Sequence, residues 1–107
     1  MSYRSAAHDA LIRRAMMLGS RYDVEVHHVR QPRYDRRGWP DLFLLGRVAA
    51  AAREVKTGRG VLSPEQQETT RRLRVAGIDF RTWREADFED GSAEREIAML
   101  SGRQPWT

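Results

Sequence analysis

The chain has 107 residues and no cysteine, and its 19 Lys and Arg residues outnumber 15 Asp and Glu. At this length it buries only about 65% of its unfolded surface, so we expect one domain over 1–107, with a core at about 5–101 and a tail at 102–107. The lack of cysteine excludes disulfide scaffolds, Cys-ligated metals and thiol nucleophiles. No run reaches the roughly 20 apolar residues of a membrane helix, which predicts a cytoplasmic protein.

The charge balance suggests a polyanionic partner. The pI is about 10.3 and the formal net charge is +4. All but one of the positive side chains are Arg, whose planar fork of donors suits phosphate. Because GC-rich coding produces the same bias, composition alone leaves the nature of the partner open.

The first half of the chain predicts a helix followed by a strand and a loop. Residues 5–19 have a helix cap at Ser5, apolar residues at helical spacing and a terminating Gly19. Residues 24–29 alternate β-branched and polar side chains, as a half-buried strand does. Residues 30–39 lack periodicity and form a basic loop.

Two central strands are expected next, over 41–45 and 49–56. The alanine run of the second could be helical by propensity, but the glycines on either side leave too little length for a stable helix. A helix over 63–76 begins with the capping sequence SPEQ and stops before Gly77.

The end of the chain predicts a strand over 78–82, with Ile78, Phe80 and Thr82 facing the core, and a helix over 93–101 with Ile97 and Leu100 inward. The order of elements is therefore α-β-β-β-α-β-α. We predict an α/β fold with a small mixed sheet flanked by helices.

Three charged residues converge at one edge of this sheet. Glu54 and Lys56 are two residues apart and share a strand face. Asp41 lies on the neighbouring strand, and two registers remain open: it is opposite Glu54, or opposite Ala52 and diagonal to Glu54. Either register allows both carboxylates to ligate one hard cation such as Mg²⁺.

Such a cation suits phosphodiester hydrolysis, because it lowers the pKa of bound water and offsets charge in the transition state. Lys56 would position or deprotonate that water, or neutralise charge. An ordinary surface ion pair between Glu54 and Lys56 is the competing interpretation, and spacing alone favours it.

The whole pattern resembles the VRR-NUC nucleases of the PD-(D/E)XK superfamily, which have a restriction-endonuclease-like core. The resemblance covers about residues 8–90 and rests on GWPDLFLLG, then REVKTGRGVLSPEQ, then a helix, then FRTWREADF. The motif PD-x(n)-E-x-K is weak by itself, and the Gly before it and the LSPEQ after it strengthen it.

The resemblance implies roles for individual residues. Asp41 and Glu54 match the carboxylates that bind the metal, and the Val55 backbone carbonyl matches a further ligand. Lys56 matches the catalytic lysine, and Gln66 matches the glutamine of the helix. Many relatives carry a Glu early in the first helix. This chain reads AAHDAL there, which makes Asp9 the nearest candidate acid, with His8 beside it.

Two sets of polar residues have alternative interpretations. Gln66 could serve only as the capping-box residue that returns to Ser63. His27 and His28 are neighbours on a strand and point to opposite faces, so they cannot both bind one ion without a bulge, although one could lie near the site.

The basic loop precedes Asp41 directly and combines positive charge with aromatic surface. We predict that it contacts nucleic acid, the alternative being a solvated loop. The predicted contact residues are Arg30, Arg33, Arg36, Arg37, Trp39 and, after Lys56, Arg59.

The function predicted from these features is a Mg²⁺-dependent DNA endonuclease, with Mn²⁺ able to substitute. The resemblance implies a homodimer acting on branched or structured DNA in replication, recombination or repair, in a bacterial or phage-infected cell. One alternative is a binding module without catalysis, against which the presence of all four motif residues argues. Another is a nuclease that prefers RNA or single strands.

Overall fold

The computed structural model describes residues 5–29 and 38–103. Its elements are α1 (Ala6–Arg21), β1 (Glu25–His28), β2 (Leu42–Leu45), β3 (Ala50–Val55), α2 (Pro64–Val75), β4 (Asp79–Trp83), α3 (Glu85–Glu89) and α4 (Ser92–Leu100).

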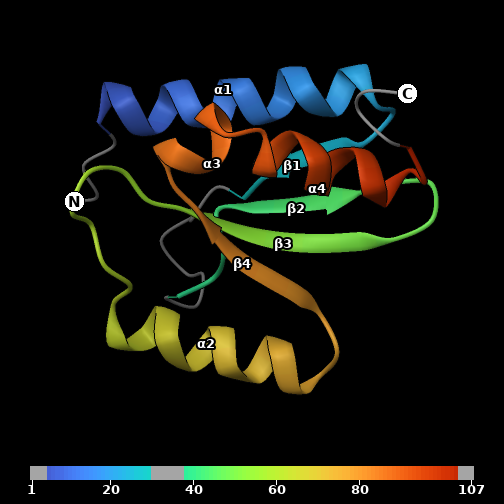
Figure 1. The fold of residues 1–107 in the computed structure, drawn as a ribbon. Coiled ribbons are helices and arrows are strands. Elements are labelled where there is room, and N and C mark those ends of the chain that lie inside the picture. The colour runs from blue at the N-terminus through green and yellow to red at the C-terminus, as the bar shows by residue number, and fades with distance from the viewer. Residues whose placement is uncertain (1–4, 30–37, 104–107) are drawn as a thin grey trace.

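The strands form one mixed sheet in the order β1-β2-β3-β4. The first three are antiparallel neighbours, whereas β4 runs parallel to β3 and is reached through the crossover helix α2 (Figure 1). The sheet therefore aligns the carboxyl ends of β3 and β4 at the same edge.

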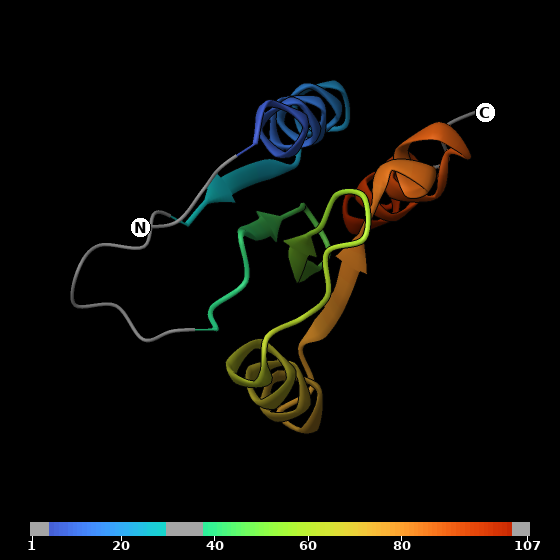
Figure 2. The same ribbon diagram turned by 90° about the vertical axis from the view of Figure 1, so that its left-hand side faces the viewer.

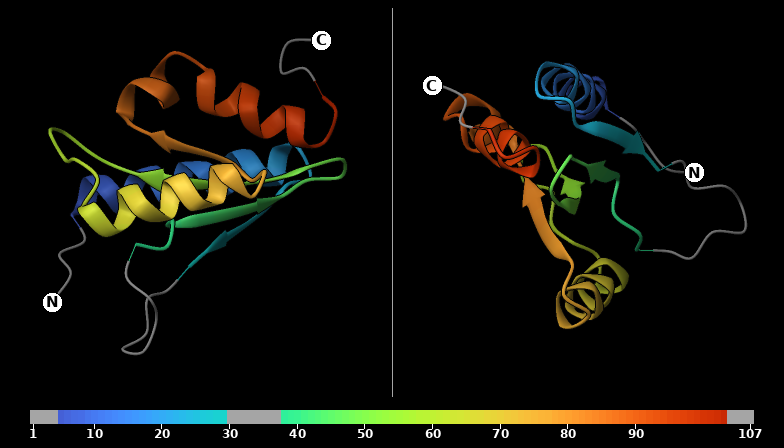
Figure 3. Two further views of the ribbon diagram at one scale, coloured as in Figure 1. Left: turned by 90° about the horizontal axis from the view of Figure 1, so that it is seen from below. Right: turned by 90° about the vertical axis from the view of Figure 1, so that its right-hand side faces the viewer.

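Helices cover both faces of the sheet. Figures 1 and 2 show α1, α3 and α4 on one side and α2 alone on the other. The right view of Figure 3 shows the same separation, and α2 packs along β4. The result is a three-layer α/β/α arrangement with unequal layers.

The main core lies between the sheet and the layer of α1, α3 and α4. Leu42 and Leu44 of β2 and Val55 of β3 are almost fully buried there, against Ala15 of α1 and Ile97 of α4. Alternate residues of β3 face the other layer, so Glu54 lies on the side of α2. None of the helices in residues 5–29 and 38–103 combines the length and apolar character that a membrane crossing requires.

The predicted fold class is confirmed, including the strand assignment of the alanine run. The predicted end of the first helix at Gly19 is wrong, because α1 continues to Arg21. Gly19 is needed inside the helix for packing: a Cβ there would lie 2.6 Å from both the Val24 carbonyl oxygen and a Val26 methyl group. The glycine marks a close approach of helix and strand.

The last third of the chain departs from prediction in two places. The five-residue helix α3 was not predicted, because it is too short for a periodic pattern; its Phe88 packs edge-on against Trp83 with ring centroids 5.6 Å apart. Ile78, predicted to face the core, is 40% exposed and precedes β4, whose buried side chains are Phe80 and Trp83. Of the predicted tail, residues 104–107 lie outside the described residues, and Arg103 pairs with Asp23 at 2.7 Å.

Candidate active site

The predicted charged residues meet at the end of the sheet where β3 and β4 finish. The first turns of α1 and α2 reach the same end, which is the left edge of the molecule in Figure 1. Segments that lie far apart in the sequence therefore meet at one place.

Asp41 is held immediately before β2. The register pairs Leu42 with Arg53, which places Asp41 opposite Glu54, the first of the two registers left open. The Val55 backbone N–H donates to Asp41 Oδ2 at 2.8 Å, and the Asp41 carbonyl accepts from the Val29 N–H at 2.7 Å. Backbone bonds from two neighbouring strands thus fix this residue.

Glu54 is a buried carboxylate with unequal oxygens. Its exposed fraction is 3%. Oε2 accepts a hydrogen bond from Gln66 Nε2 at 2.7 Å and lies 3.4 Å from Lys56 Nζ. Oε1 is buried without a hydrogen-bond partner among the described residues. A buried oxygen of this kind carries a substantial desolvation cost unless something occupies the space in front of it.

Burial has a direct electrostatic consequence for this carboxylate. The pKa of Glu54 is raised from the ordinary 4.5 to about 8, first by burial and then by the nearby Asp41 charge, while Lys56 acts in the opposite direction. The pair of carboxylates therefore holds its full negative charge poorly without a cation.

Gln66 joins the helix cap to the site. Its Oε1 accepts from the Ser63 N–H at 2.8 Å, while the Ser63 hydroxyl accepts from the Gln66 N–H at 3.1 Å, which completes a capping box. The same amide donates through Nε2 to Glu54. The capping interpretation and the contact with the site are both realised by one side chain.

Close packing fixes the chain before Asp41 against α2. Gly38 has φ +92°, and a Cβ there would lie 2.5 Å from the Glu65 carbonyl oxygen. Only glycine combines this backbone conformation with this approach. The glycine of the GWPD sequence therefore sets how Asp41 enters the sheet beside the first turn of α2.

The donor set fits a hard divalent cation. Two carboxylates lie opposite each other and one of their oxygens has no partner among the described residues, which is the chemistry that Mg²⁺ or Mn²⁺ prefers. Residues 5–29 and 38–103 contain no group of three or more His, Asp or Glu side chains arranged to hold an ion. Water and backbone oxygens would complete the coordination, and the Val55 carbonyl stays a prediction for that role.

The first helix brings His8 to the site, next to the predicted ligand Asp9. His8 Nε2 lies 3.3 Å from Asp41 Oδ2. No hydrogen bond or ion pair connects Asp9 to a site residue within the described ranges, and its role as a ligand stays a prediction. His8 and Asp9 are consecutive in the first turn of α1. Shifting the alignment of this helix with the family motif by one residue therefore replaces Asp9 with His8.

A second buried charge was missed altogether. Arg53 is 1% exposed and faces the main core. Its guanidinium bonds Glu96 Oε1 at 3.0 Å and the Asp79 carbonyl at 2.9 Å, and lies 5.2 Å from the centre of the Trp83 ring. The sequence offered one signal for this buried charge: Arg53 follows a run of alanines in a predicted central strand.

Most of the predicted nucleic-acid contacts lie outside the described residues: Arg30, Arg33, Arg36 and Arg37. Trp39 is half-buried and packs edge-on against Phe43, with centroids 6.1 Å apart, and Arg59 is exposed in the loop after Lys56. His27 is exposed and His28 half-buried, as expected for opposite faces, and His28 pairs with Leu42, next to Asp41.

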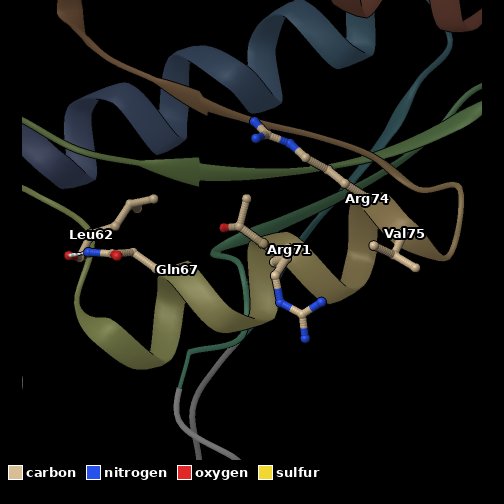
Figure 4. Close-up of a pocket in the computed structure, with 6 residues that line it drawn as sticks. Leu62, Gln67, Arg71, Arg74 and Val75 are labelled. Atoms are coloured by element: carbon tan, nitrogen blue, oxygen red, sulfur yellow. Dashed lines mark hydrogen bonds between the residues drawn. The ribbon is translucent and has the colours of Figure 1, made fainter.

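A cavity of about 400 Å³ lies along α2, apart from the carboxylates. Figure 4 shows Leu62, Gln67, Arg71, Arg74 and Val75 around it. Arg71 is paired with Glu68, and Arg74 donates to the Phe80 carbonyl at 3.2 Å. These contacts assign the arginines to the packing and surface of α2.

Comparison with known proteins supports the architecture. No protein-family model and no curated protein matches the chain. A solved structure described as a "VRR_NUC domain protein" superposes with a TM-score of 0.65 over 92% of this chain and 93% of that chain, at 19% sequence identity. The chain has a VRR_NUC-like fold. The resemblance inferred from the motifs is thus confirmed in the fold.

The VRR_NUC-like fold accounts for the position of the charged residues. In this chain, Asp41 directly precedes β2, which is the antiparallel neighbour of the strand that carries Glu54, and α2 follows Lys56 after a short loop. The match extends over nearly the whole of both chains.

Proposed function

We propose that this protein is a metal-dependent nuclease that hydrolyses phosphodiester bonds in DNA. The observation that carries the proposal is the buried Glu54, whose Oε1 has no partner among the described residues, beside Asp41 and Lys56 on a VRR_NUC-like fold. The carboxylate of a surface ion pair would not be 3% exposed, and water would bond any oxygen that its partner left free.

Asp41 and Glu54 hold the cation in this proposal, with the Val55 carbonyl as a further ligand. The bound Mg²⁺ or Mn²⁺ supplies a water of lowered pKa and positive charge next to the scissile phosphate. Asp41 is oriented for this task by the Val55 N–H, and Glu54 by the Gln66 amide. The protein thus fixes both carboxylates before a cation arrives.

Lys56 supplies the positive charge that remains with the protein. Its ammonium is 3.4 Å from Glu54 Oε2 and the side chain is 20% exposed, so it can reach both the carboxylate and a phosphate at the surface. There it offsets the negative charge that develops in the transition state. It also weakens the repulsion between the two carboxylates.

The remaining surface binds the DNA backbone. The predicted contacts of the basic loop and Arg59 would flank the carboxylates on either side in sequence, and the net charge of +4 favours a polyanion. We propose a homodimer, because one 12.4 kDa chain offers little area for DNA, and branched or structured DNA as substrate in a bacterial or phage-infected cell.

The test is cleavage of end-labelled duplex, flap and four-way junction DNA in Mg²⁺, in Mn²⁺ and in EDTA. We expect cutting that needs a cation and is lost in Glu54→Gln. Glu65→Gln is the matched control, because it makes the same chemical change at an exposed carboxylate next to Gln66. Cleavage that survives Glu54→Gln contradicts the proposed site.

Two other outcomes would redirect the proposal. Binding of DNA without cleavage in either cation would identify a binding module. In the same digests with RNA and single-stranded DNA, faster cleavage of either than of any duplex or junction would identify a nuclease with that preference.

A further inference from the structure

His8 contacts the site from a helix that the PD-x(n)-E-x-K motif does not include. It lies in the first turn of α1, which is fixed because the Ser5 side chain accepts a hydrogen bond from the His8 backbone N–H at 3.0 Å. Its Nε2 is 3.3 Å from Asp41 Oδ2, and the two side chains are 18% and 19% exposed. The ring is therefore a partly buried neighbour of a proposed metal ligand.

The other ring nitrogen determines how this contact works. Nδ1 is buried and has no hydrogen-bond partner in the described part of the chain. A neutral imidazole carries one N–H and one acceptor nitrogen. If the hydrogen were on Nδ1, a donor would be buried without an acceptor and the Nε2 lone pair would face a carboxylate oxygen. The hydrogen therefore belongs on Nε2, which donates to Asp41.

The same observation argues against direct metal binding by the ring. A histidine that ligates a metal almost always donates its second ring N–H to a carboxylate, a carbonyl or a water. Within residues 5–29 and 38–103, Nδ1 of His8 has no such acceptor, and no three-ligand group is present. The ring has the surroundings of a hydrogen-bond donor.

We propose that His8 is a positioning residue for the metal site: its Nε2–H and the Val55 N–H together hold Asp41 Oδ2, so that the other carboxylate oxygen faces the cation. His8 thereby occupies the end of the first helix where the family resemblance implies an acid. The inference rests on the proposed function, and it implies a site with two carboxylates that binds one cation.

The test is Mn²⁺ binding, followed by the free-ion electron paramagnetic resonance signal, in variants of His8. His8→Phe keeps a ring but has no donor, whereas His8→Gln keeps an N–H that can reach the carboxylate. We expect one Mn²⁺ per wild-type chain, a Kd about 10-fold or more higher in His8→Phe, and a Kd near the wild-type value in His8→Gln. His27→Phe, at an exposed histidine of β1, is the matched control and should leave the Kd unchanged.

Two results would overturn the role of His8. An unchanged Kd in His8→Phe means that the ring does not orient Asp41. Nitrogen coupling to bound Mn²⁺ that is present in wild type and absent in His8→Gln means that the ring is a ligand. Thermal melts of each variant show whether a change in Mn²⁺ binding comes from unfolding. If His8→Phe is destabilised, the nitrogen coupling and the Kd of His8→Gln decide the role of His8.

The failure of the proposed function has a different signature. A wild-type protein that binds no Mn²⁺ overturns the metal site and the role of His8 together. A wild-type protein that binds Mn²⁺ and cleaves DNA, with His8→Phe equal to it in Kd, overturns only the inference about His8.

Discussion

Arg53 and Glu54 are neighbours on β3 that point to opposite faces of the sheet, and both are nearly inaccessible, at 1% and 3% exposure. The guanidinium of Arg53 is matched by two carboxylates, two backbone carbonyls and an aromatic ring. The carboxylate of Glu54 has two partners on one oxygen and, among the described residues, none on the other.

The difference separates a structural charge from one that we propose is functional. A buried charge is tolerated when hydrogen bonds replace the water that it loses, as they do for Arg53. A half-matched charge destabilises the fold, and selection for stability alone would remove it. The degree to which a buried group is satisfied is therefore a better guide to function than its burial.

The largest expected effect tests the structural side of the comparison. Arg53→Met leaves Glu96 with fewer donors and should lower the free energy of unfolding by about 3–5 kcal/mol, measured by urea denaturation. Glu54→Gln, one residue away, should not lower stability at pH 8. Equal losses in the two variants would mean that both charges serve the fold.

A substitution of Lys56, the neighbour of Glu54, tests whether the charges at this site serve the proposed reaction. Lys56→Met should reduce the single-turnover cleavage rate by about 10² to 10³ while leaving the melting temperature and DNA affinity close to wild type, because its charge acts in the transition state. Arg72→Met removes an exposed cation of α2 and provides the control. A similar rate loss in both would point to a general effect of charge.

The pH dependence of stability sharpens the account of Glu54. Its pKa is about 8 in the folded protein against an ordinary 4.5, so the native state retains a proton that the unfolded state releases. Stability from this group is complete below pH 4.5 and declines as the pH rises towards 8. The free energy of unfolding of wild type minus that of Glu54→Gln, measured by urea denaturation at several pH values, should show this decline. Saturating Mg²⁺ should flatten it. A difference independent of pH would contradict the raised pKa.

The smallest effect concerns binding rather than chemistry. Replacing Arg36 and Arg37 with Ala should flatten the log–log dependence of DNA affinity on salt by about 0.9 for each phosphate that the protein no longer neutralises. The rate at saturating enzyme should stay unchanged. Arg71 and Arg72 replaced with Ala form the control pair, and an unaltered slope in the first variant would make the basic loop a solvated one.

Local signals in the sequence were sufficient for most of the fold. Ser5 and Ser63 cap their helices as the sequence predicted, and the glycines on either side of β3 left its alanines too little length for a stable helix. The helix α3 was missed because five residues give no period. The extra turn of α1 was missed because Gly19 is there for packing against β1, which a local rule cannot distinguish from a stop.

The site was predictable only as far as its residues share a motif or a strand. Asp41, Glu54 and Lys56 were found through spacing and resemblance, and Lys56 has a further signal, since it is the single lysine among 19 basic residues. The contact of His8 with Asp41 spans 33 positions, and that of Arg53 with Glu96 spans 43. Contacts at such separations depend on how layers pack, which no local pattern specifies.

The double role of the Gln66 amide has a consequence for the motion of α2. The same side chain closes the first turn of the helix and contacts Glu54, so fraying of that turn and release of the carboxylate are one event. Hydrogen exchange at the backbone amides of Ser63 and Gln66 should therefore slow when a cation binds between the carboxylates, although neither amide contacts it. The helix cap is then a reporter of site occupancy in the intact protein.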